Sequence, residues 1–217
     1  IIMDGNGRWG IKNKKSRNLG HKAGLLTVEN IIKQSIKKKI KFLTLYAFST
    51  ENWKRPKKEI NFLLNLLQNY LSKKTKELNK QGIKFKTIGN KNLFSKKLIN
   101  TLLNSEKVTK NNKTLQLNLA LNYGSKTELI TTFNIIKKRK ISFTERNVNN
   151  NLYTKKIPDP ELLIRTGNTN RLSNFLLWQL AYTEIYFIKK LWPDFTQKDY
   201  IKILNNFKNL KRNFGAI

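Results

Sequence analysis

The feature that most constrains the fold of this 217-residue chain is the alternation of short apolar runs with longer amphipathic segments. Apolar runs rich in β-branched and aromatic residues predict strands, and apolar residues three or four positions apart predict helices. The expected strands are 42–48, 83–88, 115–121, 162–164 and 185–188, and the expected helices are 21–39, 58–79, 95–107, 125–138 and 196–207. Strands separated by such helices form a parallel sheet, so we expect a single α/β domain over residues 1–217, with a mostly parallel central sheet flanked by helices.

Composition excludes several kinds of site. The chain has no cysteine and one histidine, which excludes disulfides, cysteine-ligated zinc, iron–sulfur clusters and a multi-histidine metal centre. No run of 18 apolar residues and no signal peptide are visible, so no transmembrane helix is expected. Ile1 and Ile2 are predicted to lie in the middle of a strand, so we expect a few residues to be missing before them.

The formal net charge is +31, from 44 Lys and Arg against 13 Asp and Glu. Such a charge suits nucleic acid or an acidic membrane surface. However, only eight of the cations are arginines, and the 36 lysines are scattered among 29 asparagines and 22 isoleucines, as A/T-rich codons would produce. We therefore favour compositional bias and expect no nucleic-acid partner. Against this background the few Arg, Asp and Glu residues are informative.

Parallel sheets bind their ligands beyond the carboxyl ends of the strands. The polar loops that follow Met3, Phe48, Leu121 and Ile164 are therefore expected to converge. In the first of them, Asp4-Gly5-Asn6-Gly7-Arg8, two glycines allow backbone amides to approach an anion, and Asp4 can hold a Mg²⁺ that bridges phosphates. The alternative is an ordinary turn, because Asp-Gly and Asn-Gly are common between elements. The segment matches neither a Walker A loop nor a dinucleotide fingerprint.

Arg17 and His21 stand near the expected start of a helix, where the N-terminus favours an anion such as a diphosphate. A solvated or capping histidine is the alternative. The loop after Phe48 places several polar side chains, a tryptophan and an arginine at a strand end: Ser49, Thr50, Glu51, Asn52, Trp53 and Arg55. An ordinary loop can hold these residues, but a tryptophan in a polar loop at a strand end indicates that the loop covers a bound ligand.

The loop after Ile164 contains Arg165 and Arg171, two of the eight arginines, and the hydroxyl of Ser173. Together they can clamp a second diphosphate. Glu184 follows in apolar surroundings, where a carboxylate is costly unless it pairs with arginine or a metal. No activated nucleophile is evident. The residues therefore indicate metal-assisted handling of one or two diphosphates, with Asp4 and Glu184 as a carboxylate pair.

Seven long segments, in order, match a known family: residues 2–9, 20–24, 46–56, 121–124, 158–167, 171–187 and 191–195. On these motifs the chain closely resembles the cis-prenyltransferases, the family of bacterial undecaprenyl diphosphate synthases (isoprenyl transferases). No two aspartates are adjacent, so the aspartate-rich motif of trans-prenyl synthases is absent. The resemblance implies repeated condensation of isopentenyl diphosphate onto an allylic diphosphate such as farnesyl diphosphate. The product would be a long-chain cis-polyprenyl diphosphate such as undecaprenyl diphosphate, precursor of the lipid carrier for cell-wall synthesis.

The resemblance also implies roles for individual residues. Asp4 and Glu184 would contact Mg²⁺, and Asn52 is the position to which the family assigns proton acceptance. A neutral amide is a very weak base, so a diphosphate oxygen or a relay from Asn52 to His21 is the alternative. The allylic diphosphate would lie against Gly5, Asn6, Gly7, Arg8, Trp9, Arg17 and His21, under a loop with Ser49, Thr50, Glu51, Trp53 and Arg55. Arg165, Arg171, Leu172 and Ser173 would bind isopentenyl diphosphate. The growing chain would enter an apolar tunnel beside Leu63, Leu64 and Leu67, for which plain core packing is the alternative.

The family further implies a homodimer in the cytoplasm, with peripheral contact to the inner membrane left open. One departure lies between Gly167 and Arg171, where Asn168-Thr169-Asn170 replace a usual Gly-Glu and a polar residue, so that a carboxylate and a flexible glycine are lost beside the isopentenyl site. Two other functions are alternatives: a non-catalytic partner subunit of such a synthase, which the intact charged residues disfavour, and a basic nucleic-acid-binding protein.

Overall fold

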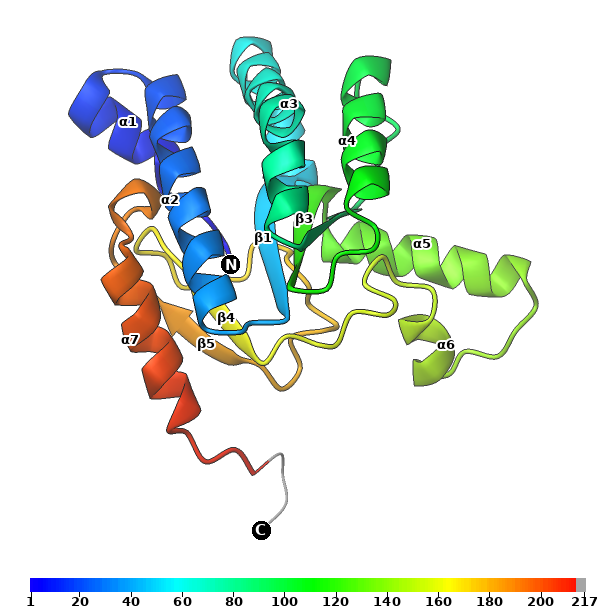
Figure 1. Cartoon of the computed structure of the whole chain (residues 1–217). Helices are drawn as coiled ribbons and strands as arrows, with labels where there is room; N and C mark the ends of the chain where they lie inside the picture. The colour runs from blue at the N-terminus through cyan, green and yellow to red at the C-terminus, as the bar shows by residue number, and fades with distance from the viewer. Residues whose placement is uncertain (214–217) are drawn as a thin grey trace.

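Five parallel strands form the central layer of the computed structural model, in which residues 1–213 are described (Figure 1). Strands β1 (Phe42–Ser49), β3 (Leu115–Tyr123) and β2 (Ile83–Ile88) pair in the order β1-β3-β2, and β4 (Leu162–Arg165) pairs with β5 (Glu184–Phe187). Ile2 makes parallel bridges to Tyr46 of β1 and Arg165 of β4 and so joins the two sheets. The predicted parallel α/β fold is confirmed.

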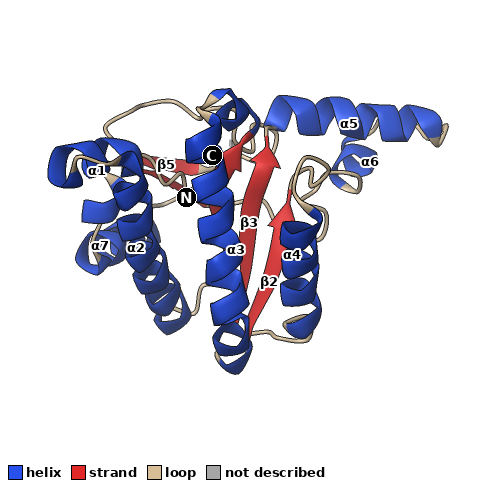
Figure 2. Cartoon of the chain, turned by 90° about the horizontal axis from the view of Figure 1, so that it is seen from above, coloured by secondary structure: helices blue, strands red, loops and turns tan. Residues whose placement is uncertain are grey.

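Helices flank this layer (Figure 2). They are α1 (Asn6–Lys14), α2 (Arg17–Lys37), α3 (Lys57–Lys80), α4 (Lys96–Val108), α5 (Ser125–Lys138), α6 (Glu145–Asn149) and α7 (Gln197–Lys208), with 3₁₀ turns η1 (Thr50–Lys54) and η2 (Trp192–Asp194). Ser95 caps α4 as predicted, since its hydroxyl accepts the Leu98 N–H at 3.2 Å. The long predicted helices therefore form within a few residues of their expected bounds.

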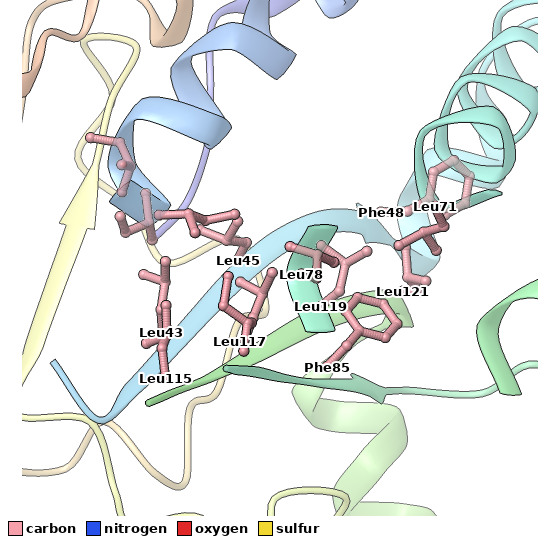
Figure 3. Close-up of a cluster of buried hydrophobic side chains, with 14 of the residues drawn as sticks. Leu43, Leu45, Phe48, Leu71, Leu78, Phe85, Leu115, Leu117, Leu119 and Leu121 are labelled. Carbon is pink, nitrogen blue, oxygen red and sulfur yellow. The ribbon is translucent and has the colours of Figure 1, made fainter. Parts of the chain in front are cut away.

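The main core lies between the sheet and helices α2, α3, α4 and α7. Figure 3 shows leucines from neighbouring strands meeting in this core, with Leu43 and Leu45 from β1 beside Leu115 and Leu117 from β3. Alternate strand residues point to the same face, so these side chains form one apolar surface. Leu45 is fully buried, and its truncation to alanine is expected to cost about 2–5 kcal/mol.

The opposite face of the sheet is covered largely by irregular chain. Tyr46, Tyr123 and Leu163 pack there against Phe175 and other residues of the segment 172–180. The rings of Tyr46 and Phe175 stack with centroids 4.4 Å apart. This packing holds the segment after β4 close to the carboxyl end of β1, where the predicted loops gather.

Helix α1 forms where a polar loop was expected after Met3. Its apolar residues are too few to predict a helix, and contact with α2 stabilises it instead. A Cβ on Gly10 would lie 2.2 Å from the Ser16 carbonyl oxygen, and one on Gly20 would lie 1.9 Å from the Asn6 carbonyl oxygen. These glycines therefore allow the two helices to touch backbone to backbone, which side chains would prevent.

Candidate active site

A polar pocket of about 510 Å³ lies at the carboxyl ends of β1 and β4. Ten residues predicted for the site line it: Asp4, Asn6, His21, Ser49, Glu51, Asn52, Arg55, Arg165, Arg171 and Ser173. The loops after Met3, Phe48 and Ile164 thus converge as the parallel topology requires. Strand β3 runs past Leu121 to Tyr123, and its Asn122 reaches the same region by accepting a hydrogen bond from Trp53 of η1.

Asp4 is held between two guanidinium groups. Its Oδ2 accepts from Arg165 Nη2 at 2.9 Å, and its Oδ1 accepts from Arg8 Nη2 at 3.2 Å. Arg8 Nη2 also donates to the Gly167 carbonyl at 2.6 Å. Arg165 is buried, so its charge requires the Asp4 partner. The carboxylate of Asp4 remains partly exposed, which leaves it accessible from the pocket.

Arg165 also orders the chain that follows β4. Its Nη1 donates to Ser173 Oγ at 2.8 Å and to the main-chain carbonyl of Arg171. The strap, which we define as residues 171–174, is thereby fixed at the pocket edge. The Arg171 side chain is exposed there, so its cationic group is available to an anion.

A second cationic group surrounds Glu59, in the first turn of α3. Glu59 accepts from Arg17 Nε at 3.0 Å and Nη2 at 3.2 Å, and from Arg55 Nη1 at 3.0 Å. His21 Nε2 lies 3.6 Å from the same carboxylate. Burial opposes ionisation of Glu59, but the hydrogen bonds and charges of both arginines hold its pKa below the usual value. Glu59 thus joins α2 to the segment that follows β1.

His21 is neutral in this environment. Burial, and then the positive charges of Arg55 and Arg17, lower its pKa from 6.5 to about 4, although Glu59 acts in the opposite direction. Its Nε2 and the side-chain oxygen of Asn6 are buried without a hydrogen-bond partner. Both residues line the pocket, so they offer one acceptor and one neutral imidazole to a bound group.

The η1 turn is fastened to the ends of β1 and β3. The Asn52 side-chain oxygen accepts the Ser49 N–H at 3.2 Å, in a capping box with the Ser49 hydroxyl. Trp53 Nε1 donates to Asn122 Oδ1 at 2.8 Å, and its ring packs on Phe48 and Phe94. Trp53 therefore anchors the turn.

An apolar cavity of about 140 Å³ adjoins the polar pocket. Met3, Asn6, His21, Ala47, Phe48 and Leu63 line both spaces. Leu64, Leu67 and Tyr70 of α3 and Val28 of α2 continue the lining of the cavity. An apolar group attached to an anion in the pocket would thus meet an apolar surface.

The remaining predicted residues lie outside the pocket lining. Arg8, Arg17 and Trp53 act through the contacts given above, and Gly5, Gly7 and Thr50 are each next in the chain to a residue that lines the pocket. A Cβ on Gly7 would lie 2.7 Å from the Arg17 guanidinium, so this glycine makes room for that side chain. Trp9 Nε1 donates to Asp194 Oδ1 at 2.6 Å. Leu172 packs against the apolar cluster on the opposite face of the sheet, which contains Tyr46 and Phe175.

The expected pairing of Glu184 with Asp4 in one chain is wrong. Glu184 begins β5 in register with Leu162, whereas Arg165, which contacts Asp4, is in register with Phe187. Three strand residues span about 10 Å, so Glu184 lies at the other end of its strand. There its Oε1 is 3.7 Å from Arg212 Nε.

Three polar residues of this region were missed from the sequence. Glu59 and Asn122 anchor the residues described above, and Asn174 of the strap donates to Glu51 at 2.9 Å. The one available signal was Glu59, a rare carboxylate four positions after Arg55 at a helix start. Among residues 1–213 no group of three or more Asp, Glu and His is placed to hold a metal, and no helix there is long and apolar enough to cross a membrane.

Comparison with known proteins identifies the family. Residues 2–215 match the family model described as "Putative undecaprenyl diphosphate synthase". The chain is 46% identical to the isoprenyl transferase of Clostridium tetani, over 100% of this chain and 88% of the relative, and 44% identical to that of Rickettsia bellii, over 99% and 96%.

Two solved structures agree with this match. Lavandulyl diphosphate synthase from Lavandula x intermedia, in complex with dimethylallyl diphosphate, superposes with a TM-score of 0.94 at 32% identity, over 100% of this chain and 96% of that one. A "probable undecaprenyl diphosphate synthase" from Campylobacter jejuni has a TM-score of 0.83 at 36% identity, over 90% and 93%. The chain therefore belongs to the undecaprenyl diphosphate synthase family and is a prenyltransferase.

Proposed function

We propose that the protein is a Mg²⁺-dependent cis-prenyltransferase that condenses isopentenyl diphosphate repeatedly onto an allylic diphosphate, with farnesyl diphosphate as primer and undecaprenyl diphosphate as product. One observation carries this proposal: a polar pocket with two separate cationic groups adjoins an apolar cavity. Two diphosphates need two cationic sites, and an oily chain needs an apolar one.

The allylic diphosphate is assigned to the group around Glu59. Arg17, Arg55 and His21 contact Glu59. Arg55 and His21 line the pocket together with Asn6 and Asp4. The structure solved with dimethylallyl diphosphate, itself an allylic diphosphate, supports this class of substrate. Neutralisation of the leaving diphosphate by these cations lowers the cost of charge separation at the allylic carbon.

Isopentenyl diphosphate is assigned to the strap. Arg171 and the Ser173 hydroxyl border the pocket, and Arg165 holds both of them in place. Two anion subsites in one pocket would bring the reacting carbons together, which supplies the proximity that carbon–carbon bond formation requires. The Asn168-Thr169-Asn170 departure lies beside this subsite and changes substrate affinity or loop motion rather than the reaction class.

Magnesium is assigned to Asp4. Mg²⁺ prefers oxygen ligands and is commonly held by one or two carboxylates together with substrate phosphates. The partly exposed Asp4 carboxylate fits that donor set. When bound, the ion would neutralise phosphate charge and help to expel the leaving group. Glu184 is not assigned to this ion within the same chain, because β5 directs it to the other end of the sheet.

Asn52 is assigned a positioning function in place of proton acceptance. Its side-chain oxygen accepts the Ser49 N–H, and a neutral amide is a very weak base. A diphosphate oxygen is the better proton acceptor in the pocket. The growing chain is assigned to the apolar cavity beside Leu63, Leu64 and Leu67.

A homodimer in the cytoplasm completes the proposal. Exposed apolar side chains lie on α5 and β5, including Ile130, Phe133, Ile185 and Phe187, and burial of such a surface favours association. The many lysines suit a transient contact with anionic lipid during product release.

The proposal is tested by incubation of the purified protein with farnesyl diphosphate, labelled isopentenyl diphosphate and Mg²⁺. Products longer by several five-carbon units, with cis double bonds, are expected. Absence of elongation in a folded sample would overturn the proposal, and the longest product gives the chain length.

A further inference from the structure

Asn174 stands where three segments of the chain meet. It belongs to the strap, with a main-chain φ of 61°, in the left-handed region that asparagine tolerates. Its side-chain Oδ1 accepts the Lys126 N–H at 2.9 Å, and its carbonyl accepts the Ser125 N–H at 2.8 Å. Asn174 thus caps the first turn of α5.

This contact fixes the direction of the amide. Because Oδ1 faces a backbone N–H, the Nδ2 group points the other way, where it donates to Glu51 Oε1 at 2.9 Å. Burial opposes ionisation of Glu51, but the bond from Asn174 and those within η1 hold its pKa below the usual value. The bond therefore joins a fixed donor to an ionised acceptor.

A glycine opposite Asn174 supports the same junction. A Cβ on Gly124 would lie 2.6 Å from Asn174 Nδ2 and 2.6 Å from Thr50 Oγ1. Any side chain at position 124 would therefore separate η1 from the strap. The close approach of the three segments therefore depends on Gly124, directly after β3, as well as on Asn174.

We propose that Asn174 is a positioning residue that sets the spacing between the two diphosphate subsites. Through Glu51 it fixes η1, which precedes Arg55 of the allylic subsite. Through the strap it is continuous with Arg171 and Ser173 of the isopentenyl subsite. The inference rests on the proposed function and adds a physical connection between the allylic and isopentenyl subsites.

Three variants separate this connection from the capping of α5. Asn174→Asp keeps an oxygen for Lys126 N–H but turns a carboxylate toward Glu51. Glu51→Gln removes the charge alone. The double variant Glu51→Gln/Asn174→Asp restores one hydrogen bond with donor and acceptor exchanged, at the same total charge. Asn104→Asp, on the exposed face of α4, is the matched control.

Condensation kinetics and hydrogen–deuterium exchange of residues 49–55 are measured for each protein. We expect Asn174→Asp to lower kcat/KM for isopentenyl diphosphate about tenfold or more and to speed exchange in 49–55, because two carboxylates then face each other. The double variant is expected to recover to within about threefold of the parent protein, and Asn104→Asp to match it.

A single Asn174→Asp variant with parental kinetics and exchange overturns the inference, and so does a double variant no better than that single change. If the parent protein makes no product, the proposed function fails, and the exchange of 49–55 still decides whether Asn174 positions η1.

Discussion

Arg17 and Glu59 form a two-pronged ion pair between α2 and α3, with Nε–Oε2 and Nη2–Oε1 distances of 3.0 and 3.2 Å. The same Oε1 accepts from Arg55. One buried carboxylate therefore orients two guanidinium groups before any substrate arrives. Loss of such a partner leaves buried charges without compensation, which is costly.

Replacement of Glu59 by glutamine keeps the side-chain volume but removes the negative charge and one of the two oxygens that accept from Arg17 and Arg55. We expect KM for the allylic diphosphate to rise about tenfold, with kcat changed less than about threefold, because the arginines lose their preset positions. Steady-state kinetics measure both. Glu77→Gln, at an exposed position of the same helix, is the control; an unchanged KM in Glu59→Gln contradicts the role.

The single histidine gives a pH prediction. Because the pKa of His21 falls from 6.5 unfolded to about 4 folded, the unfolded chain binds more protons between these values. The neutral His21 side chain therefore contributes fully to the free energy of unfolding above about pH 6.5. This contribution, about 3 kcal/mol, is lost as the pH falls to about 4. The imidazole proton resonance in NMR reports the midpoint directly. A midpoint near 6.5 would contradict the burial argument, and His21→Gln should weaken the pH slope.

Asp4→Asn removes the charge that faces Arg8 and Arg165 without changing size. Turnover is expected to fall at least about a hundredfold, because the assigned metal loses its carboxylate. The circular dichroism spectrum should stay that of a folded protein. Chelation of Mg²⁺ should likewise abolish turnover by the parent protein. A near-normal rate for the variant would remove the metal role.

Arg171→Ala tests the isopentenyl subsite. The main-chain carbonyl that binds Arg165 is kept, so only the exposed guanidinium is lost. KM for isopentenyl diphosphate should rise at least about tenfold, with little change for the primer. Arg146→Ala, on α6, serves as the control. Equal effects on both substrates would refute the assignment.

Trp53→Phe separates the anchoring bond from the ring packing. The aromatic contacts with Phe48 and Phe94 persist, whereas Asn122 Oδ1 loses its donor. Urea unfolding should show a loss of about 1–2 kcal/mol. No loss of stability would mean that the indole N–H does not fasten η1.

Much of the fold could be predicted from local pattern. Helix α5 begins and ends where apolar spacing indicated, and Ser95 caps α4. Helix α1 could not be predicted, because Gly7, Gly10 and several lysines give no apolar period. Its stability comes from backbone contact with α2, a tertiary effect that a local pattern does not contain.

The residues of the candidate site were likewise only partly predictable from the sequence. Asp4, Arg165 and Ser173 were expected together because parallel strands share one carboxyl edge, and the structure brings them together. Glu59 was missed because its partners include Arg17, 42 positions away. Glu184 was misplaced because the register of β5 decides at which end of the sheet its carboxylate lies.

The central claim is that one pocket holds two diphosphates at once. Calorimetric titration with a non-reactive thiodiphosphate analogue of the primer, then with isopentenyl diphosphate in the presence of Mg²⁺, measures this directly. One molecule of each should bind per chain, with the second binding undiminished by the first. Displacement of the primer analogue by isopentenyl diphosphate would contradict the account.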